Sequence, residues 1–189
     1  MKTVKNLSVA LTIAASLTSY NVFSHEFLGI GEGGYVGIAV GESDLDMDWF
    51  DHPTGWEIYG GWELSDYFGL EVSYIDFGKF ENPYATDTNG LIQSIDVEAY
   101  TLGLIGKIPI TETIDIFAKI GYSHWDADVS LVGYSDNSWD TFWGVGANYK
   151  VSEHFAVGVR YSEYKLDAVG PAVWEDDVSL VSLNLEYHF

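Results

Sequence analysis

The sequence contains no cysteine, only four prolines and only eight basic residues, against 29 acidic ones in 189 residues. The absence of cysteine excludes disulfide frameworks, thiolate metal sites and cysteine nucleophiles. A formal net charge of −21 argues against nucleic-acid binding, which needs basic groups to neutralise phosphates. Downstream of residue 24, no run reaches the roughly 18 apolar residues that indicate a membrane-spanning helix.

The first 24 residues have the pattern of a secretory signal peptide. Lys2 and Lys5 precede a mostly apolar run over 7–17, and Val22 and Ser24 occupy the −3 and −1 positions of a cleavage site. The apolar run is shorter than the roughly 20 residues of a membrane anchor. We therefore expect cleavage after Ser24, export from the cytoplasm, and one folded domain over 25–189.

That domain is rich in alternating apolar and polar residues, the pattern of β-strands. Clear runs cover 68–74, 114–122, 139–149, 155–161 and 181–189, and less regular runs lie near 34–42, 54–64 and 94–109. One short motif occurs three times, beginning at Ser65, Thr111 and Ser152. It consists of Ser or Thr, an acid and any residue, with an apolar residue on each side. Such side chains can bond nearby backbone groups, so the motif predicts a tight turn. Longer polar segments lie near 43–53, 78–93, 127–137 and 166–176. The sequence predicts an all-β fold, an eight-stranded antiparallel up-and-down barrel with short turns at one end and long loops at the other.

The alternation alone does not separate a barrel in lipid from a soluble secreted barrel. Strands of about 9–11 residues match the length that crosses a bilayer when tilted. Aromatic residues gather towards the ends of the apolar faces, as in the interfacial girdles of membrane barrels. The opposite face carries glycine, serine and charge, which suits a narrow polar lumen better than a dry core. These features favour a transmembrane barrel.

Several segments resemble strands of the OmpA-like transmembrane domain, a family of small outer-membrane barrels. They are Gly106–Ile110, Phe117–Tyr122 and Gly144–Tyr149. The last strand resembles the assembly signal of outer-membrane proteins through Val181, Leu183, Leu185, Tyr187 and Phe189. The resemblance covers Gly34 to Phe189 and implies location in the outer membrane, short turns in the periplasm and insertion by the outer-membrane assembly machinery. Cell-wall anchoring, which belongs to a further soluble domain in OmpA, is not expected here.

Seven charged residues are expected to point into the lumen. They are Glu57, Glu63, Glu71, Glu186, Lys107, Lys119 and Arg160. Isolated buried charges are costly, so these must pair or stay hydrated. One interpretation is a plug of paired charges that holds the barrel together, and the alternative is a small or gated channel in which a cation exchanges partners. The family resemblance places Glu71, Lys107 and Arg160 in such a cluster, while Asn148 stands where some relatives have a second acid.

The loops are acidic, and Asp44, Asp46 and Asp48 alternate as some calcium ligands do. The glycine and distal glutamate of an EF-hand are absent, so we expect a solvated loop and no dedicated metal site. Divalent cations could still bridge loop carboxylates to the phosphates of lipopolysaccharide. No cofactor is expected, and we expect a monomer whose main role is structural, in outer-membrane integrity and loop presentation.

A lipid A-modifying enzyme is the distant alternative. Ser123, His124 and Asp126 form the one cluster with a nucleophile, a base and an acid. Neighbouring residues on a strand point to opposite faces, so Ser123 and His124 are badly arranged for catalysis. We therefore expect no enzymatic activity.

Overall fold

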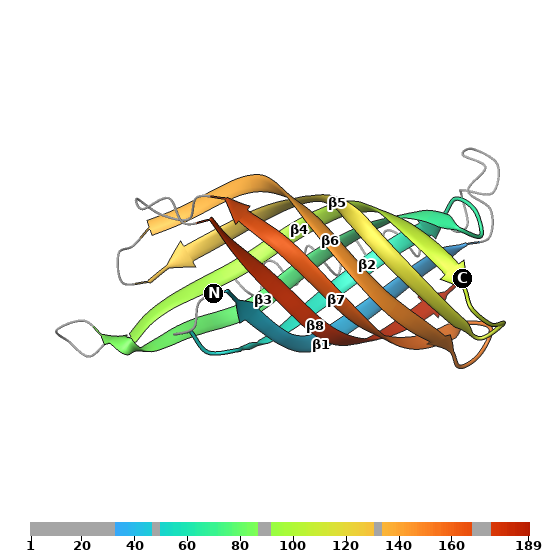
Figure 1. Ribbon diagram of the computed structural model, residues 1–189, viewed down its shortest axis with the longest axis horizontal. Helices are drawn as coiled ribbons and strands as arrows, with labels where there is room; N and C mark the ends of the chain where they lie inside the picture. The colour runs from blue at the N-terminus through green and yellow to red at the C-terminus, as the bar shows by residue number, and fades with distance from the viewer. Residues whose placement is uncertain (1–32, 47–49, 87–91, 131–133, 168–174) are drawn as a thin grey trace.

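The computed structural model describes residues 33–46, 50–86, 92–130, 134–167 and 175–189, which form eight β-strands in one closed barrel (Figure 1). The strands are β1 (Gly34–Leu45), β2 (Thr54–Glu63), β3 (Phe68–Thr86), β4 (Ile92–Pro109), β5 (Ile114–Val129), β6 (Tyr134–Lys150), β7 (Phe155–Asp167) and β8 (Glu175–His188). Each pairs antiparallel with its sequence neighbour, and β1 pairs with β8 to close the barrel. The predicted eight-stranded up-and-down barrel is confirmed. The predicted signal peptide lies outside the described residues.

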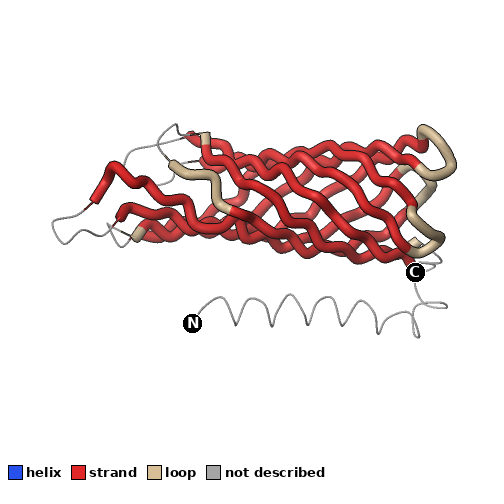
Figure 2. The backbone as a smooth tube through the Cα atoms, turned by 90° about the horizontal axis from the view of Figure 1, so that it is seen from below, coloured by secondary structure: helices blue, strands red, loops and turns tan. Residues whose placement is uncertain are grey.

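The three predicted short turns lie together at one end of the barrel, here called the turn end (Figure 2). In each turn, the hydroxyl oxygen of the Ser or Thr that begins the motif accepts a hydrogen bond from the backbone N–H three residues later. The N–H of Phe68 donates to Ser65 Oγ at 3.1 Å, and that of Ile114 donates to Thr111 Oγ1 at 3.0 Å. The third turn repeats this with Ser152 and the N–H of Phe155 at 3.1 Å. The opposite end, which holds the longer connections, is called the loop end.

The outward face carries a belt of exposed aliphatic side chains. Leu102, Leu104, Ile120 and Leu183 are 56 to 70% exposed. Aromatic rings lie on both sides of this belt: Tyr74, Tyr100 and Trp56 pack together towards the loop end, and Phe155, Tyr187 and Phe189 towards the turn end. A soluble monomer rarely exposes so large a continuous apolar surface, whereas a membrane barrel turns such a belt to lipid between aromatic girdles. The described residues contain no helix long and apolar enough to cross a membrane.

Strands β3 to β6 extend well beyond the expected length at the loop end. β3 has 19 residues, β4 has 18, β5 has 16 and β6 has 17, so the predicted length of about 9–11 residues is wrong for these four strands. The predicted loops near 78–93 and 127–137 are mostly strand, and the β3–β4 hairpin projects furthest from the barrel (Figure 1). The predicted loops near 43–53 and 166–176 lie mostly between strands, although 43–45 belong to β1, 166–167 to β7 and 175–176 to β8.

A β-bulge in β3 explains why alternation missed this extension. The pairing with β4 shifts by one residue between Asp76 and Lys79, and Gly78 within it has a φ of 81°. The N–H of Gly78 donates to Asp76 Oδ1 at 2.8 Å, which holds the local bend. An extra residue in one strand reverses the inward and outward alternation beyond it.

Candidate functional site in the barrel interior

Five charged side chains meet inside the barrel, in the half nearer the turn end. This group, here called the charge cluster, consists of Glu57, Glu71, Lys119, Arg160 and Glu186. Each residue is at most 3% exposed. Five different strands supply the five side chains, namely β2, β3, β5, β7 and β8. Because the members come from around the whole wall, their contacts tie opposite sides of the barrel to one another.

Arg160 lies at the centre of the charge cluster. Its guanidinium donates to both oxygens of Glu71, with Nη1 to Oε1 at 3.2 Å and Nη2 to Oε2 at 3.1 Å. Nη2 also donates to Glu186 Oε1 at 2.9 Å, and Nη1 lies 3.6 Å from Glu57 Oε2. The guanidinium carbon lies 3.6 Å from the centre of the Tyr59 ring. A forked pair with a carboxylate, stacked on an aromatic ring, is the strong geometry for a buried arginine.

The remaining members are also held by several hydrogen bonds each. Lys119 Nζ lies 3.3 Å from Glu57 Oε1 and 3.3 Å from Glu71 Oε1. The hydroxyl of Tyr35 donates to Glu71 Oε2 at 2.9 Å. Asn148 Nδ2 donates to Glu186 Oε2 at 3.0 Å. Asn148 therefore bonds an acid of the cluster, and Arg160 finds its partners on β3 and β8 instead.

The charge cluster contains three carboxylates and two cations, so it carries one negative charge in excess when all five groups are ionised. His188 lies beside it at the turn end, with Nε2 at 3.2 Å from Glu186 Oε2. This ring is charged only if protonated, and it also stacks on Tyr35 with the ring centres 5.5 Å apart. The excess charge makes each cation of the cluster difficult to remove.

Lys107 lies outside the charge cluster, in contrast to its predicted place in it. Its Nζ pairs with Glu63 Oε1 at 2.7 Å, and the side chains are 12% and 33% exposed. The ammonium also lies over the Tyr35 ring, 4.5 Å from its centre. This pair forms a separate contact near the turn end. Lys119 is the lysine that contacts the cluster acids directly.

The half of the interior nearer the loop end holds an apolar core, which the sequence analysis missed. Fourteen residues make up this layer, here called the apolar layer: Leu45, Ile75, Phe77, Phe80, Ile95, Val97, Ala99, Trp125, Ala127, Phe142, Tyr164, Leu166, Val178 and Leu180. The Phe142 and Tyr164 rings stack with centres 5.3 Å apart, and Lys119 Nζ lies 5.6 Å from the Phe142 ring centre. The expected polar lumen is therefore present in one half only, and Phe142 marks the boundary.

Two of the loop acids that were weak metal candidates, Asp44 and Asp46, make separate contacts. Asp44 Oδ1 lies 3.1 Å from His52 Nδ1, and the backbone N–H of Asp46 donates to the Asp177 carbonyl at 3.2 Å. Asp48 lies outside the described residues. Among the residues that the structure describes, no group of three or more His, Cys, Asp or Glu side chains is placed to hold a metal ion.

The candidate catalytic residues are separated by the barrel wall. Ser123 is buried inside and donates to the Asp140 carbonyl at 3.2 Å. His124 lies on the outward face, where its ring stacks on Trp139 with the centres 4.9 Å apart. A serine nucleophile needs its base within hydrogen-bond reach, and this pair does not meet that requirement.

The five residues of the predicted assembly signal lie on the outward face of β8. Val181, Leu183, Leu185, Tyr187 and Phe189 are 37 to 70% exposed. The N–H of Phe189 donates to the Gly34 carbonyl at 2.9 Å, across the seam where the first and last strands meet. These residues therefore form a continuous apolar stripe along the seam of the barrel.

The closed eight-stranded wall, its lipid-facing belt and its buried charges define a transmembrane β-barrel. A family model described as the outer membrane protein beta-barrel domain matches residues 7–189, and the chain belongs to this family. The turn end is accordingly periplasmic and the loop end extracellular. The family assignment supports location in the outer membrane.

Curated relatives and solved structures agree with this assignment. The chain is 25% identical over 174 residues to outer membrane protein A of Escherichia fergusonii and 26% identical over 174 residues to that of Salmonella typhi. Each match covers 82% of this chain and 48% of the relative, so the chain spans about half the length of the curated relatives it matches.

Two solved barrels show the same fold. The structure of Neisserial surface protein A is similar with a TM-score of 0.65 and 16% identity, over 83% of this chain and 97% of that one. The N-terminal β-barrel domain of Pseudomonas aeruginosa OprF has a TM-score of 0.55 and 13% identity, over 82% of this chain and 97% of that one.

Proposed function

We propose that this protein is a structural barrel of the outer membrane, with a closed interior and a main role in membrane integrity and in presenting its extracellular loops. The observation that carries this proposal is that two different layers fill the interior in series. The charge cluster fills the periplasmic half, and the apolar layer fills the extracellular half. Eight strands leave an interior only just wide enough for side chains. A solute would have to disrupt both layers to pass.

The charge cluster also contributes to stability in this proposal. Its hydrogen bonds cross the lumen between strands far apart in sequence, such as β3 and β7 through Glu71 and Arg160. Removing one partner of a buried ion pair costs about 3–5 kcal/mol, because an uncompensated charge remains. The excess negative charge of the cluster places Arg160→Ala at the upper end of that range.

Single-channel recording tests this function on the refolded barrel, residues 25–189, in planar bilayers. We expect a silent membrane for the unchanged protein and for Arg160→Ala, together with a lower free energy of unfolding in the variant. Heat-dependent mobility on gels confirms that each protein is folded. Unchanged conductance together with unchanged stability in Arg160→Ala would contradict both the plug and the channel.

A gated channel is the second candidate, and unused hydrogen-bonding capacity in the lumen favours it. Arg160 Nε, Ser182 Oγ and Asn184 Oδ1 are buried and have no hydrogen-bond partner among the described residues. A network with unused donors and acceptors can adopt a second arrangement, with Arg160, Lys107 or Lys119 exchanging carboxylate partners. Discrete openings of the unchanged protein that change in Arg160→Ala would establish this candidate and reject the closed barrel.

We also propose that the extracellular extension lies against lipopolysaccharide, with divalent cations between its carboxylates and the lipid phosphates. Asp76, Glu98 and Asp126 occupy one cross-strand row on the outward face. This row lies directly beyond Tyr74 and Tyr100, on the side of the loop end. In an anionic leaflet, such carboxylates are unfavourable unless cations lie between them and the phosphates. Chelation should lower the thermal stability of the barrel in lipopolysaccharide and leave it unchanged in zwitterionic detergent. Equal stability before and after chelation in lipopolysaccharide would reject this contact.

The last strand is proposed to serve as the signal for the outer-membrane assembly machinery. Its apolar stripe lies on the lipid-facing side of the β1–β8 seam, the last pairing needed to close the barrel. Replacing Phe189 with alanine should reduce the amount of folded barrel in the outer membrane. The same variant should refold into detergent as the unchanged protein does. Normal membrane levels of the variant would contradict the signal function.

A further inference from the structure

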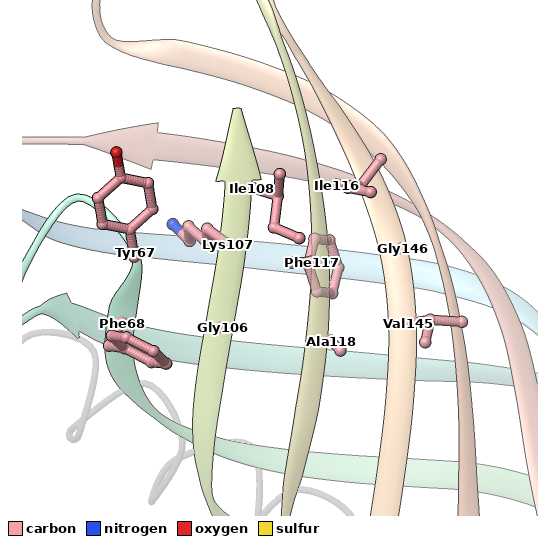
Figure 3. A pocket seen from close by; sticks show the side chains of 10 residues that line it. All are labelled: Tyr67, Phe68, Gly106, Lys107, Ile108, Ile116, Phe117, Ala118, Val145 and Gly146. Atoms are coloured by element: carbon pink, nitrogen blue, oxygen red, sulfur yellow. The ribbon is translucent and has the colours of Figure 1, made fainter. Parts of the chain in front are cut away.

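A groove of about 610 Å³ indents the lipid-facing surface near the turn end (Figure 3). The small residues Gly106 on β4 and Ala118 on β5 form its floor, with Phe68 on one side and Val145 on the other. These four residues are paired across the sheet in one row. Ile108 and Ile116 form the next outward row and bound the groove on the side nearer the periplasm (Figure 3). The groove is therefore an apolar depression in the part of the wall that contacts the periplasmic leaflet.

The packing of the barrel does not require glycine at position 106. A Cβ atom built there would meet its nearest neighbour, a Phe68 ring carbon, at 3.9 Å, which is ordinary contact. Glycines inside the barrel differ: at Gly121 and Gly146 the same atom would lie 2.1 Å and 2.4 Å from neighbours. Glycine weakens a strand, and inside a strand it often marks a place where a ligand approaches the backbone closely. At position 106 the open side of the glycine faces outward, away from the barrel interior.

The size of the groove indicates which molecule fills it. A stable protein interface takes about 20–30 residues from each partner, and ten residues line this groove. Its volume falls within the range of roughly 300–1,000 Å³ that is typical of small-molecule sites. Leu104 and Ile120 in the next row are 58% and 63% exposed on the outward face. In a transmembrane barrel such an outward apolar band faces hydrocarbon. An apolar chain therefore fits the groove better than a protein surface does.

We propose that the Gly106–Ala118 groove holds one acyl chain of a phospholipid from the periplasmic leaflet. The chain enters beside Tyr67 in the first periplasmic turn and lies over Gly106 and Ala118, between Phe68 and Val145 (Figure 3). Apolar surface is already in hydrocarbon here, so retention rests on close van der Waals packing. The site lies on the outer wall, and it does not depend on whether the lumen is closed.

A groove-filling variant tests this proposal. Ala118→Leu places a side chain over the floor of the groove without touching the interior. The matched control is Ala147→Leu, which adds the same side chain at a lipid-facing position beside Ile116 that does not line the groove. Native mass spectrometry of the folded barrel in detergent, titrated with palmitoyl-oleoyl phosphatidylethanolamine, measures the fraction that carries one lipid. Heat-dependent gel mobility establishes folding in each case.

We expect one retained phospholipid in the unchanged protein and in Ala147→Leu. Losing about ten carbon–carbon contacts should weaken retention roughly tenfold in Ala118→Leu. Equal lipid retention in all three proteins would overturn the proposal. Sedimentation of the same samples tests for the other possible occupant, a second copy of the chain. A dimer that Ala118→Leu converts to a monomer would show that a second copy fills the groove, and this result would also overturn the proposal.

Discussion

Phe77 and Phe80 are three residues apart on β3, yet both side chains lie inside the barrel and are fully buried. On a regular strand they would point to opposite faces. The bulge at Gly78 inserts one residue between them and returns the second ring to the interior. Both rings then join the apolar layer, so the bulge lets β3 pack into the interior on both sides of Gly78.

Replacing Gly78 with alanine should therefore destabilise the β3–β4 extension. The φ of 81° is unfavourable for a residue with a side chain, and the new Cβ would lie 2.8 Å from the Thr54 carbonyl oxygen. We expect a loss of about 1–3 kcal/mol in local stability. Hydrogen exchange should show faster exchange over 79–82 with little change over 101–105. Gly106→Ala is the control, because its Cβ meets no close contact, and similar exchange in both variants would contradict the importance of the bulge.

Alternation predicted the fold because most strands keep a period of two across the membrane, where one face meets lipid and the other the lumen. The Ser65, Thr111 and Ser152 turns were predictable for a local reason, since a hydroxyl accepts the hydrogen bond within three residues. The extension of β3 was not, because the bulge at Gly78 changes the period at that point. The outward side chains of the extension are also polar, so its sequence resembles that of a polar loop.

The two lysines that point inward should differ in their effect on stability. Lys119 bridges two fully buried acids, so Lys119→Gln should cost about 3–5 kcal/mol. Lys107 pairs with a single, partly exposed acid, and Lys107→Gln should cost about 1 kcal/mol or less. Urea unfolding in lipid vesicles measures both variants under the same conditions. A larger loss for Lys107→Gln than for Lys119→Gln would contradict the assignment of Lys119, and not Lys107, to the charge cluster.

The alternation along each strand predicted which charged side chains point into the lumen. It did not predict which acid each cation contacts. Glu57, Glu71, Lys119, Arg160 and Glu186 were expected inside because they alternate with the apolar face. Which acid a cation reaches depends on strand register and barrel tilt. This is why Lys107, expected in the cluster by family resemblance, pairs with Glu63 instead. Most of the apolar layer was missed because its residues lie on the extensions, beyond the segments predicted as strands. Ile95, Val97, Ala99 and Phe142 are the exceptions, since they lie within the predicted runs at 94–109 and 139–149.

If the interior is sealed twice, opening it should require changes in both layers. Phe142→Ala removes the ring at the boundary and should cost about 3–5 kcal/mol in stability. This variant alone should remain silent in planar bilayers, since the charge cluster below it is intact. The double variant Phe142→Ala with Arg160→Ala should conduct. Conductance in either single variant would show that one layer alone forms the seal.

The extracellular end should become more stable on acidification because of Asp177, which lies beyond the lipid-facing part of β8. Partial burial raises the pKa of its carboxyl, the negative charge of Glu163 raises it further, and Lys165 opposes both. Asp46 adds a smaller repulsion that also raises this pKa. A carboxyl whose pKa is higher in the folded than in the unfolded state favours folding when it is protonated.

The contribution of Asp177 is therefore fully present below the unfolded pKa of about 3.9 and is lost as the pH rises through the higher folded value. Hydrogen-exchange protection over 177–180 and 163–166 should increase between pH 7 and about pH 4, after correction for the intrinsic rates. Asp177→Asn cannot ionise, so it should be more protected at pH 7 and lose this contribution to the pH dependence. If the asparagine variant keeps the full pH dependence, other carboxylates of the extension are responsible for it.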